Sequence, residues 1–348
     1  MKALAARLVV IGRALLRGAA MFAVTLLGLA FVTFAVGRLL PTDPVLAAVG
    51  DRASAELYER TRLEMGLDRP LAEQFLAYLG RLARGDLGPS FTTGRSVGED
   101  IATFFPATLE LSTVAIVLGA GLGVPLGVAA AARRGRLVDH LARLVALVGY
   151  SVPVFWLGLV ALLVFYVKLG WAAGPGRLDV VYEYTVPVVT GSVLVDTALT
   201  GDPGAFRDAL AHIVLPASIL GFYSMAYITR MTRAFMLAEL GQEYVVAARA
   251  KGAGEGRVLW AHAFRNVAVP LVTVIALAYA HLLEGTVLTE TVFAWPGIGL
   301  YITQGLFSAD LNAVLGGTLV VGVTVLVLNA AADALAGVLD PRTRRRWA

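Results

Sequence analysis

The sequence contains no cysteine, few charged residues and only four histidines. Without cysteine there is no disulfide, no thiolate metal site and no cysteine nucleophile. His140, His212, His262 and His281 stand far apart, and none has a metal-ligand spacing such as HExxH, so no metal site is expected. There is also no GxSxG nucleophile elbow, no glycosidase-type carboxylate pair and no GxxxxGK[ST] phosphate loop. We therefore expect no catalytic residue and no bound ATP in this chain.

The composition instead points to the membrane. Hydrophobic residues make up 58% of the 348 residues and charged residues 16%, against averages of about 45–50% and about 25% in soluble domains. Disordered chains are poor in apolar residues, so disorder is excluded. The net charge of +4 is too small to indicate a nucleic-acid partner. We predict an integral membrane protein.

Long uncharged runs identify the membrane spans, since about 20 apolar residues cross the hydrocarbon layer as a helix. The candidate runs are 18–37, 111–132, 144–167, 209–229, 266–283, 291–309 and 311–332. The run 291–309 contains the turn signal Pro296-Gly297 together with Gly299 and Gly305. When that run is not counted as a span, six spans remain. Both termini and the second and fourth connections between spans then lie on one side of the membrane, and this side contains most of the lysines and arginines. This agrees with the positive-inside tendency.

The sequence therefore predicts an all-α integral membrane protein with six transmembrane helices and both termini cytoplasmic. A helical extracytoplasmic insertion separates spans one and two, because 54–65 and 71–84 have apolar residues at helical spacing. Gly119, Gly123 and Gly127 in span two predict close packing within one bundle, in preference to a dedicated subunit interface. The predicted segments are an interfacial segment 1–17, span one 18–37, the extracytoplasmic domain 38–105, a core 106–340 with spans 107–132, 144–168, 209–230, 267–288 and 311–333, a cytoplasmic loop 231–266 inside that core, and a basic tail 341–348.

When sequence position is converted to depth at a helical rise of about 1.5 Å per residue, the ionisable residues lie near the ends of these spans. Glu110 and Glu284 fall near the outer interface and Asp333 near the inner one. His281 lies deeper, and a lone histidine is more often a hydrogen-bonded packing residue than a proton relay. Ion-coupled carriers keep ionisable residues well inside the bilayer, so this distribution counts against such a carrier.

The longest cytoplasmic connection, 230–265, contains a predicted short helix over 239–251. Leu240, Tyr244, Val245 and Ala248 share its apolar face, and Gly252 begins the break that follows. A second helical piece over 257–266 leads to span five. Small residues allow close approach of another backbone, and the basic residues suit an acidic partner. By spacing alone, the segment is better explained as a basic amphipathic loop lying on anionic lipid.

Several stretches of the sequence resemble one known protein family. The stretch Glu243-Tyr244-Val245-Val246-Ala247-Ala248-Arg249-Ala250-Lys251-Gly252-Ala253, followed by His262, Arg265-Asn266 and Pro270, resembles the EAA loop of ABC importer permeases, in the version of the dipeptide/oligopeptide/nickel permease subunits. Further stretches resemble the same family in the same order: Leu39-Leu40-Pro41-Thr42-Asp43-Pro44, Gly66-Leu67-Asp68-Arg69-Pro70, Gly85-Asp86-Leu87-Gly88, Pro106-Ala107-Thr108-Leu109-Glu110, Glu290-Thr291-Val292-Phe293 with Trp295-Pro296-Gly297-Ile298-Gly299, and Asp340-Pro341-Arg342. The chain departs from the pattern at Thr42, where glycine is usual, at Val246, where the short consensus has glutamate, and at Glu284.

The resemblance implies a permease subunit of an ATP-driven importer for di-/oligopeptides or similar small solutes, in a bacterial or archaeal cell inner membrane. The implied partners are a second homologous permease, two cytoplasmic ATPases that carry ATP and Mg, an extracytoplasmic solute-binding protein, the solute and membrane lipid. Dipeptides, longer peptides, glutathione-like compounds, opines and nickel complexes stay open as solutes. An ion-coupled secondary carrier is the alternative, and a membrane-embedded enzyme comes third.

The resemblance also assigns two sets of residues. The implied ATPase-coupling residues are Glu243, Tyr244, Ala247, Ala248, Arg249, Ala250, Lys251, Gly252, His262, Arg265, Asn266 and Pro270. The implied candidates for contact with the binding protein are Asp43, Asp68, Asp86, Glu290, Phe293, Pro296, Gly297 and Gly299.

Overall fold

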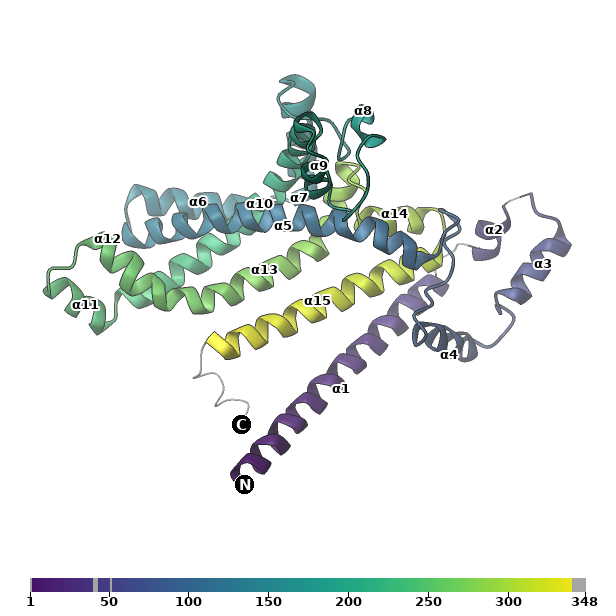
Figure 1. Cartoon of the computed structure of the whole chain (residues 1–348), viewed down its shortest axis with the longest axis horizontal. Helices are drawn as coiled ribbons and strands as arrows, with labels where there is room; N and C mark the ends of the chain where they lie inside the picture. Colours follow the sequence, from purple (N-terminus) through teal and green to yellow (C-terminus); the bar gives the residue numbers. More distant parts are fainter. Residues whose placement is uncertain (1, 40–42, 51, 340–348) are drawn as a thin grey trace. The chain divides into compact units, whose positions relative to one another are not determined.

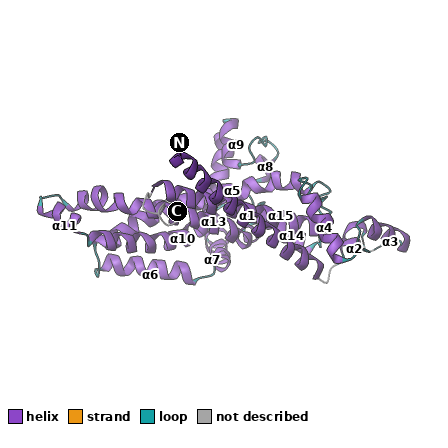
Figure 2. Cartoon of the chain, turned by 90° about the horizontal axis from the view of Figure 1, so that it is seen from below, coloured by secondary structure: helices purple, strands orange, loops and turns teal. Residues whose placement is uncertain are grey.

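A computed structural model describes residues 2–39, 43–50 and 52–339. The described chain is helical apart from its turns and loops (Figure 2). The predicted tail 341–348, with its arginines, lies outside the described residues, as do the side chains of 1–17. The elements in chain order are α1 (Lys2–Leu39), α2 (Pro44–Val49), α3 (Ala55–Glu64), α4 (Leu71–Leu82), α5 (Val97–Ala132), α6 (Leu137–Ser151), α7 (Val154–Ala161), the π-helical η1 (Leu162–Lys168), α8 (Val180–Glu183), α9 (Val193–Thr200), α10 (Pro203–Leu240), α11 (Glu243–Ala250), α12 (Glu255–Arg257), the π-helical η2 (Val258–Ala263), α13 (Phe264–Val292), α14 (Ile298–Phe307) and α15 (Leu311–Leu339).

Among the described residues, five helices are long and apolar enough to cross a membrane. Their bounds are Ala20–Arg38, Val97–Ala132, Pro203–Leu240, Glu255–Val292 and Leu311–Leu335. A sixth span results if the bent pair Leu137–Ser151 and Val154–Lys168 is counted as one. At 10 residues, α14 is too short to span. The fold is thus the predicted all-α membrane architecture with five to six candidate spans.

The region predicted as span three differs from a single helix over 144–168. The apolar helix starts earlier, at Leu137, and the chain bends by 99° where α6 gives way to α7. Val152 is extended, with φ −87° and ψ 128°, and Pro153 has no N–H to continue the helix. The break therefore falls at the Val152-Pro153 dipeptide.

Several helices also extend beyond the predicted spans. The predicted span 209–230 lies inside α10, which starts at Pro203. Asp202 caps that start and accepts a hydrogen bond from the Gly204 N–H at 2.8 Å. The predicted span 267–288 lies inside the continuous helical stretch from Glu255 to Val292. Charged residues limit the apolar run in the sequence, but they do not stop a helix that continues past the hydrocarbon layer.

The chain forms two compact units, which are described separately. The first comprises residues up to Phe105 together with Gly297–Leu326. Its helices α3 and α4 lie where the apolar spacing predicted them. Ala30, Phe34, Tyr78 and Leu315 form one buried cluster, which joins α1, α4 and α15. Buried polar residues hold the loop before α5: Asp310 accepts hydrogen bonds from the Ser90 hydroxyl at 2.6 Å and from the Thr92 N–H at 3.0 Å.

The second unit comprises Pro106–Pro296 and the part of α15 that begins at Val327. Its core joins α5, α10 and α13, and α10 also packs against α6 (Figure 1). The glycine row of α5 lies against α10, as predicted: a Cβ at Gly127 would come within 2.6 Å of the Thr232 Cβ. A Cβ at Gly119 would clash with the Ser224 hydroxyl. The row therefore serves packing within this chain.

Candidate functional site

The predicted coupling residues gather at one end of the α10 and α13 pair, where α11 and α12 connect the two long helices (Figure 1). The short helix is shorter than the predicted 239–251, because Glu239 and Leu240 still belong to α10. The rest of the predicted loop 231–266 is also largely helical, since α12 and η2 continue directly into α13. This segment, 239–266, is called the coupling segment below.

Three side chains join the helices of the coupling segment. The Tyr244 hydroxyl on α11 donates a hydrogen bond to Glu239 Oε2 at the end of α10, at 2.6 Å. Asn266 at the start of α13 donates from Nδ2 to the Tyr244 hydroxyl at 3.0 Å. Burial and the hydrogen bond to Glu239 raise the pKa of Tyr244, so the hydroxyl stays protonated and able to donate near neutral pH. We call these three residues the Glu239–Tyr244–Asn266 triad; they bind α10, α11 and α13 together.

A second contact closes the turn after α11. Arg249 donates from Nε and Nη2 to the two carboxylate oxygens of Glu255, at 2.9 and 3.2 Å. Between them, Gly252 has φ +82°, a conformation that side chains with a Cβ rarely adopt. The Arg249 guanidinium thus already has an acidic neighbour within the chain, and its contact with an acidic partner stays a prediction.

The remaining coupling residues divide into anchors and an exposed surface. Val245, which is 0% exposed, anchors α11 to the rest of the second unit. His262 is half-buried in η2, Ala248 is half-buried on α11, and Pro270 lies inside α13. The exposed set comprises Glu243, Ala247, Ala250, Lys251, Gly252, Arg265 and Pro270. The coupling segment therefore exposes small residues of α11 and the basic residues Lys251 and Arg265, while buried Val245 anchors the helix.

The predicted outer contact residues separate by exposure. Asp68 and Asp86 are exposed in the first unit, Asp43 is half-buried, and Gly297 and Gly299 are buried there. Asp43 accepts a hydrogen bond from the Tyr58 hydroxyl at 2.7 Å and caps α2. Of the predicted contact residues in this unit, Asp68 and Asp86 are thus the two with exposed side chains.

The candidates in the second unit are mostly interior. Glu290 is 0% exposed and accepts a hydrogen bond from the Thr108 hydroxyl at 2.6 Å, while Phe293 is 2% exposed. Pro296 is half-buried. The apolar turn that contains Trp295 folds inward because the indole N–H donates to the Ala107 carbonyl at 2.9 Å. In this structure Glu290 and Phe293 support the outer turn from within, and they offer no side-chain surface to a docking protein.

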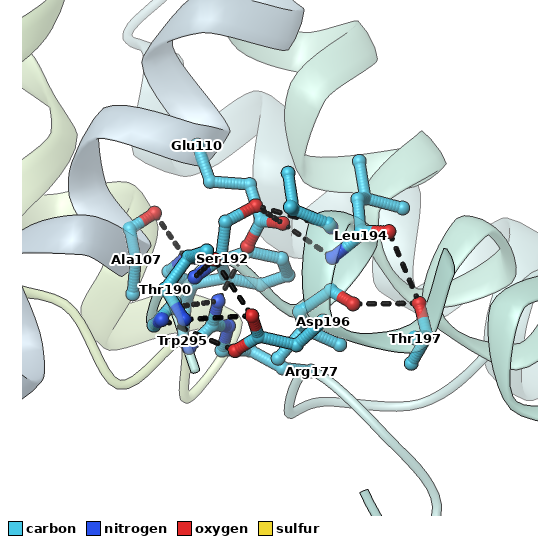
Figure 3. Close-up of polar contacts among 12 residues, drawn as sticks. Ala107, Glu110, Arg177, Thr190, Ser192, Leu194, Asp196, Thr197 and Trp295 are labelled. Atoms are coloured by element: carbon cyan, nitrogen blue, oxygen red, sulfur yellow. Dashed lines mark hydrogen bonds and ion pairs between the residues drawn. The ribbon is translucent and has the colours of Figure 1, made fainter. Parts of the chain in front are cut away.

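A buried polar network that sequence reasoning missed holds the connection 168–208, which is called the second outer loop below because the sequence predicts it outside the membrane (Figure 3). Glu110 on α5 accepts hydrogen bonds from the Ser192 hydroxyl and the Leu194 N–H, both at 2.7 Å, and forms an ion pair with Arg177. Arg177 also lies over the Trp295 ring, with its guanidinium carbon 5.5 Å from the centroid. The stretch 106–110 was recognised by its resemblance to the family, but no sequence pattern indicated that Glu110 pairs with Arg177.

Asp196 organises the loop beside this network. Its carboxylate accepts hydrogen bonds from the Val189, Thr190 and Gly191 N–H groups and from the Thr190 hydroxyl, at 2.7–3.2 Å. Burial alone would raise the pKa of Asp196, but these hydrogen bonds outweigh burial and hold the pKa below its usual value. Buried hydrogen bonds therefore hold the second outer loop, and Glu110 attaches it to α5.

Comparison with known proteins identifies the family. Residues 123–345 match the family described as binding-protein-dependent transport system inner membrane component, and residues 11–112 match the N-terminal region described for such membrane components. The di/tripeptide transport system permease protein DppB of Pseudomonas aeruginosa is 43% identical over 92% of this chain and 96% of its own length. The dipeptide transport system permease protein DppB of Escherichia coli K12 is 42% identical over the same shares.

A solved structure of the MetNI methionine ABC transporter, in an inward-facing conformation, aligns with a TM-score of 0.48 at 20% identity, over 67% of this chain and 93% of that chain. The two family matches together cover most of the sequence, and the two permeases align over nearly their full lengths. The chain therefore belongs to the inner membrane components of binding-protein-dependent transport systems, and it is a multi-pass permease of the cell inner membrane.

Proposed function

We propose that this permease imports dipeptides or tripeptides, driven by ATP hydrolysis on partner subunits. The relatives at 42–43% identity are named as di/tripeptide and dipeptide permeases and align over 96% of their own lengths. Family membership favours this function over the ion-coupled secondary carrier considered from the sequence. ATP and Mg belong to the ATPase partners, and the permease itself binds neither.

The observation that carries the coupling mechanism is the Glu239–Tyr244–Asn266 triad. Because α11 is joined both to the end of α10 and to the start of α13, a displacement of α11 moves both membrane helices. Its exposed small residues, Ala247 and Ala250, allow a cleft on an ATPase to approach the helix backbone closely. In the proposed cycle, closure of two ATPases moves α11 as a rigid lever. The bundle then switches between outward-facing and inward-facing states.

The topology and the remaining partners follow from this coupling role. The coupling segment and both termini lie in the cytoplasm, and the insertion between α1 and α5 lies outside. A solute-binding protein docks on that insertion, where Asp68 and Asp86 are exposed. A second homologous permease supplies the other half of the pathway. Selectivity then resides mainly in the binding protein, in line with the scarcity of ionisable residues deep in the spans.

The direct test is uptake by a reconstituted complex. The chain, its partner permease and the two ATPases are placed in proteoliposomes with the binding protein outside and a labelled dipeptide as solute. We expect uptake to require ATP and Mg on the ATPase side and to be insensitive to a collapsed proton gradient. Uptake that follows an imposed ion gradient without ATP would support the carrier instead. ATP-driven uptake of another solute class but not of dipeptides would support the proposed mechanism and contradict the proposed substrate class.

A further inference from the structure

The first unit contains a cavity of about 280 Å³ that the transport mechanism does not use. Its walls come from the end of α1, the turn between α3 and α4, helix α4 itself and the start of α15. All of these segments belong to one compact unit.

Three arginines line this cavity: Arg38 on α1, Arg69 in the turn and Arg81 on α4. Within the residues that the structure describes, none of the three has an ion-pair partner. Arg38 and Arg81 are also near enough to repel each other electrostatically. The one acidic lining residue, Glu64, is already paired with Arg60 at 2.9 Å. The cavity therefore has an excess of positive charge, which an anion would neutralise. Arginine binds phosphate oxygens particularly well, through parallel N–H donors.

The position of the cavity indicates where that anion comes from. Arg38 ends the apolar stretch of α1, and Leu311, another lining residue, begins that of α15. Both helices therefore meet the membrane surface at this level. Phe34 and Leu315 belong to the buried apolar cluster beside the cavity, and the Arg38 guanidinium carbon lies 5.4 Å from the Phe34 ring centroid. A cationic site bordered by apolar residues at the end of a span suits a phospholipid headgroup and its acyl chains.

Helix α4 gives independent support for contact with lipid. Besides the side chains that pack inward, it carries Leu71 and Leu76, which are 62% and 66% exposed. Large apolar side chains left exposed on an amphipathic helix suit a helix that lies in the membrane interface. The cavity and this apolar surface share α4, so a lipid bound in the cavity could extend its chains alongside the helix.

Gln74 adds a requirement on the headgroup. Its Nε2 donates to the Arg69 carbonyl at 2.8 Å, which fixes the amide orientation. Its Oε1 is buried and accepts no hydrogen bond from any described residue. A buried acceptor of this kind is costly unless a donor reaches it. A headgroup that carries hydroxyl groups as well as a phosphate would satisfy both the arginines and Gln74.

We propose that this cavity binds an anionic glycerophospholipid with a hydroxyl-bearing headgroup, of the phosphatidylglycerol class, in the leaflet that faces the insertion. The phosphate contacts Arg38 and Arg81, and the bound lipid holds α4 and the insertion against the membrane ends of α1 and α15. The lipid site does not depend on which solute is transported.

The test measures lipid binding to the purified complex by native mass spectrometry. Dioleoyl phosphatidylglycerol or dioleoyl phosphatidylcholine is titrated into detergent-solubilised complex, with either wild-type chain, Arg38→Gln/Arg81→Gln or the control Arg62→Gln/Arg84→Gln. The control removes the same charge from positions of the insertion that do not line the cavity. We expect the tightest phosphatidylglycerol site to weaken at least tenfold in the cavity variant and not in the control. We also expect wild type to prefer phosphatidylglycerol over phosphatidylcholine.

Three results would overturn the proposal. The first is equal phosphatidylglycerol affinity in all three proteins. The second is equal affinity of wild type for the two lipids, a comparison that needs no variant and so does not depend on variant folding. The third is unchanged lipid binding together with weaker docking of the solute-binding protein on the cavity variant. That outcome would assign the arginines to an acidic protein surface. ATP-driven uptake is measured on the same preparations, so a failure of the proposed transport function is recognised separately.

Discussion

The Tyr244 hydroxyl donates a 2.6 Å hydrogen bond to the Glu239 carboxylate, and this bond links α11 to the last turn of α10. Asn266 donates to the same hydroxyl from the first turn of α13. Burial of Val245 also anchors this short helix, and the triad adds a direct link to the ends of both long helices. The triad makes α11 an extension of two membrane helices at once, which is what a lever between an ATPase and a permease requires.

Removal of the Tyr244 hydroxyl should loosen this link. Tyr244→Phe keeps the ring and removes a hydrogen bond to a charged group, with a net contribution of about 1.5–3 kcal/mol. We expect roughly a tenfold or greater fall in uptake per ATP hydrolysed, at unchanged membrane levels. Tyr184→Phe, on an 85% exposed tyrosine of the second outer loop, is the matched control. Equal coupling ratios in the two variants would contradict the role of the triad.

Substitution of Gly252 should act through the backbone conformation at this position, because the space around the residue is open. A Cβ added there meets nothing within 4 Å, but the φ of +82° disfavours a β-branched residue by at least about 1–2 kcal/mol. We expect Gly252→Val to reduce coupled uptake severalfold while insertion stays normal. Gly254→Val provides the control in the same turn, because Gly254 has an extended backbone with φ −64° and equally open space. Wild-type uptake by Gly252→Val at equal membrane levels would rule out the strained-turn explanation.

The buried Glu110–Arg177 pair should matter far more than an exposed ion pair of the same chemistry. Arg177→Met leaves a buried carboxylate without its cation, a change that typically costs about 3–5 kcal/mol. Arg62→Met breaks the exposed pair with Glu59 and should cost less than about 1 kcal/mol. Thermal unfolding in detergent checks both. Similar melting temperatures for the two variants would mean that the buried network does not stabilise the second unit.

Asp196 should make the second outer loop sensitive to acid. Because its folded-state pKa is lowered, its stabilising contribution is fully present above the unfolded pKa of about 3.9 and is lost as pH falls through the lower folded value. Asp196→Asn should therefore lower the melting temperature near neutral pH. The difference from wild type should shrink as the pH falls below about 4. A difference that stays constant from neutral to acid pH would contradict this assignment.

Local pattern was enough to predict much of the fold. Apolar spacing located α3 and α4, uncharged runs located the long apolar helices, and the glycine row of α5 predicted its close packing. These features depend on residues within one helix or on one helical face. The proline positions were less informative, since Pro216 and Pro270 stay inside helices whereas Pro153 follows a break. Neighbouring helices decide whether a proline is tolerated, and the local sequence does not describe them.

Long-range polar partners could not be predicted. Glu110 and Arg177 are 67 residues apart, and Arg233, which pairs with Asp139 at 2.6 Å, is 94 residues from it. No periodicity connects such residues, because their contact results from the packing of helices that are distant in sequence. Glu290 was named as an outer contact from the family resemblance alone, and a motif match does not indicate that the residue is fully buried in this chain.

The most direct test of the coupling role is a cross-link from α11. Because the chain has no cysteine, Ala250→Cys creates a single thiol on an exposed position of that helix. A short photo-cross-linker attached there in native membranes captures its neighbour, which mass spectrometry identifies. We expect an ATPase subunit as the main adduct, with the yield or site of the cross-link changed by ATP. Lipid adducts alone, in membranes that contain the ATPases, would contradict the coupling role and favour a loop that lies on the membrane surface.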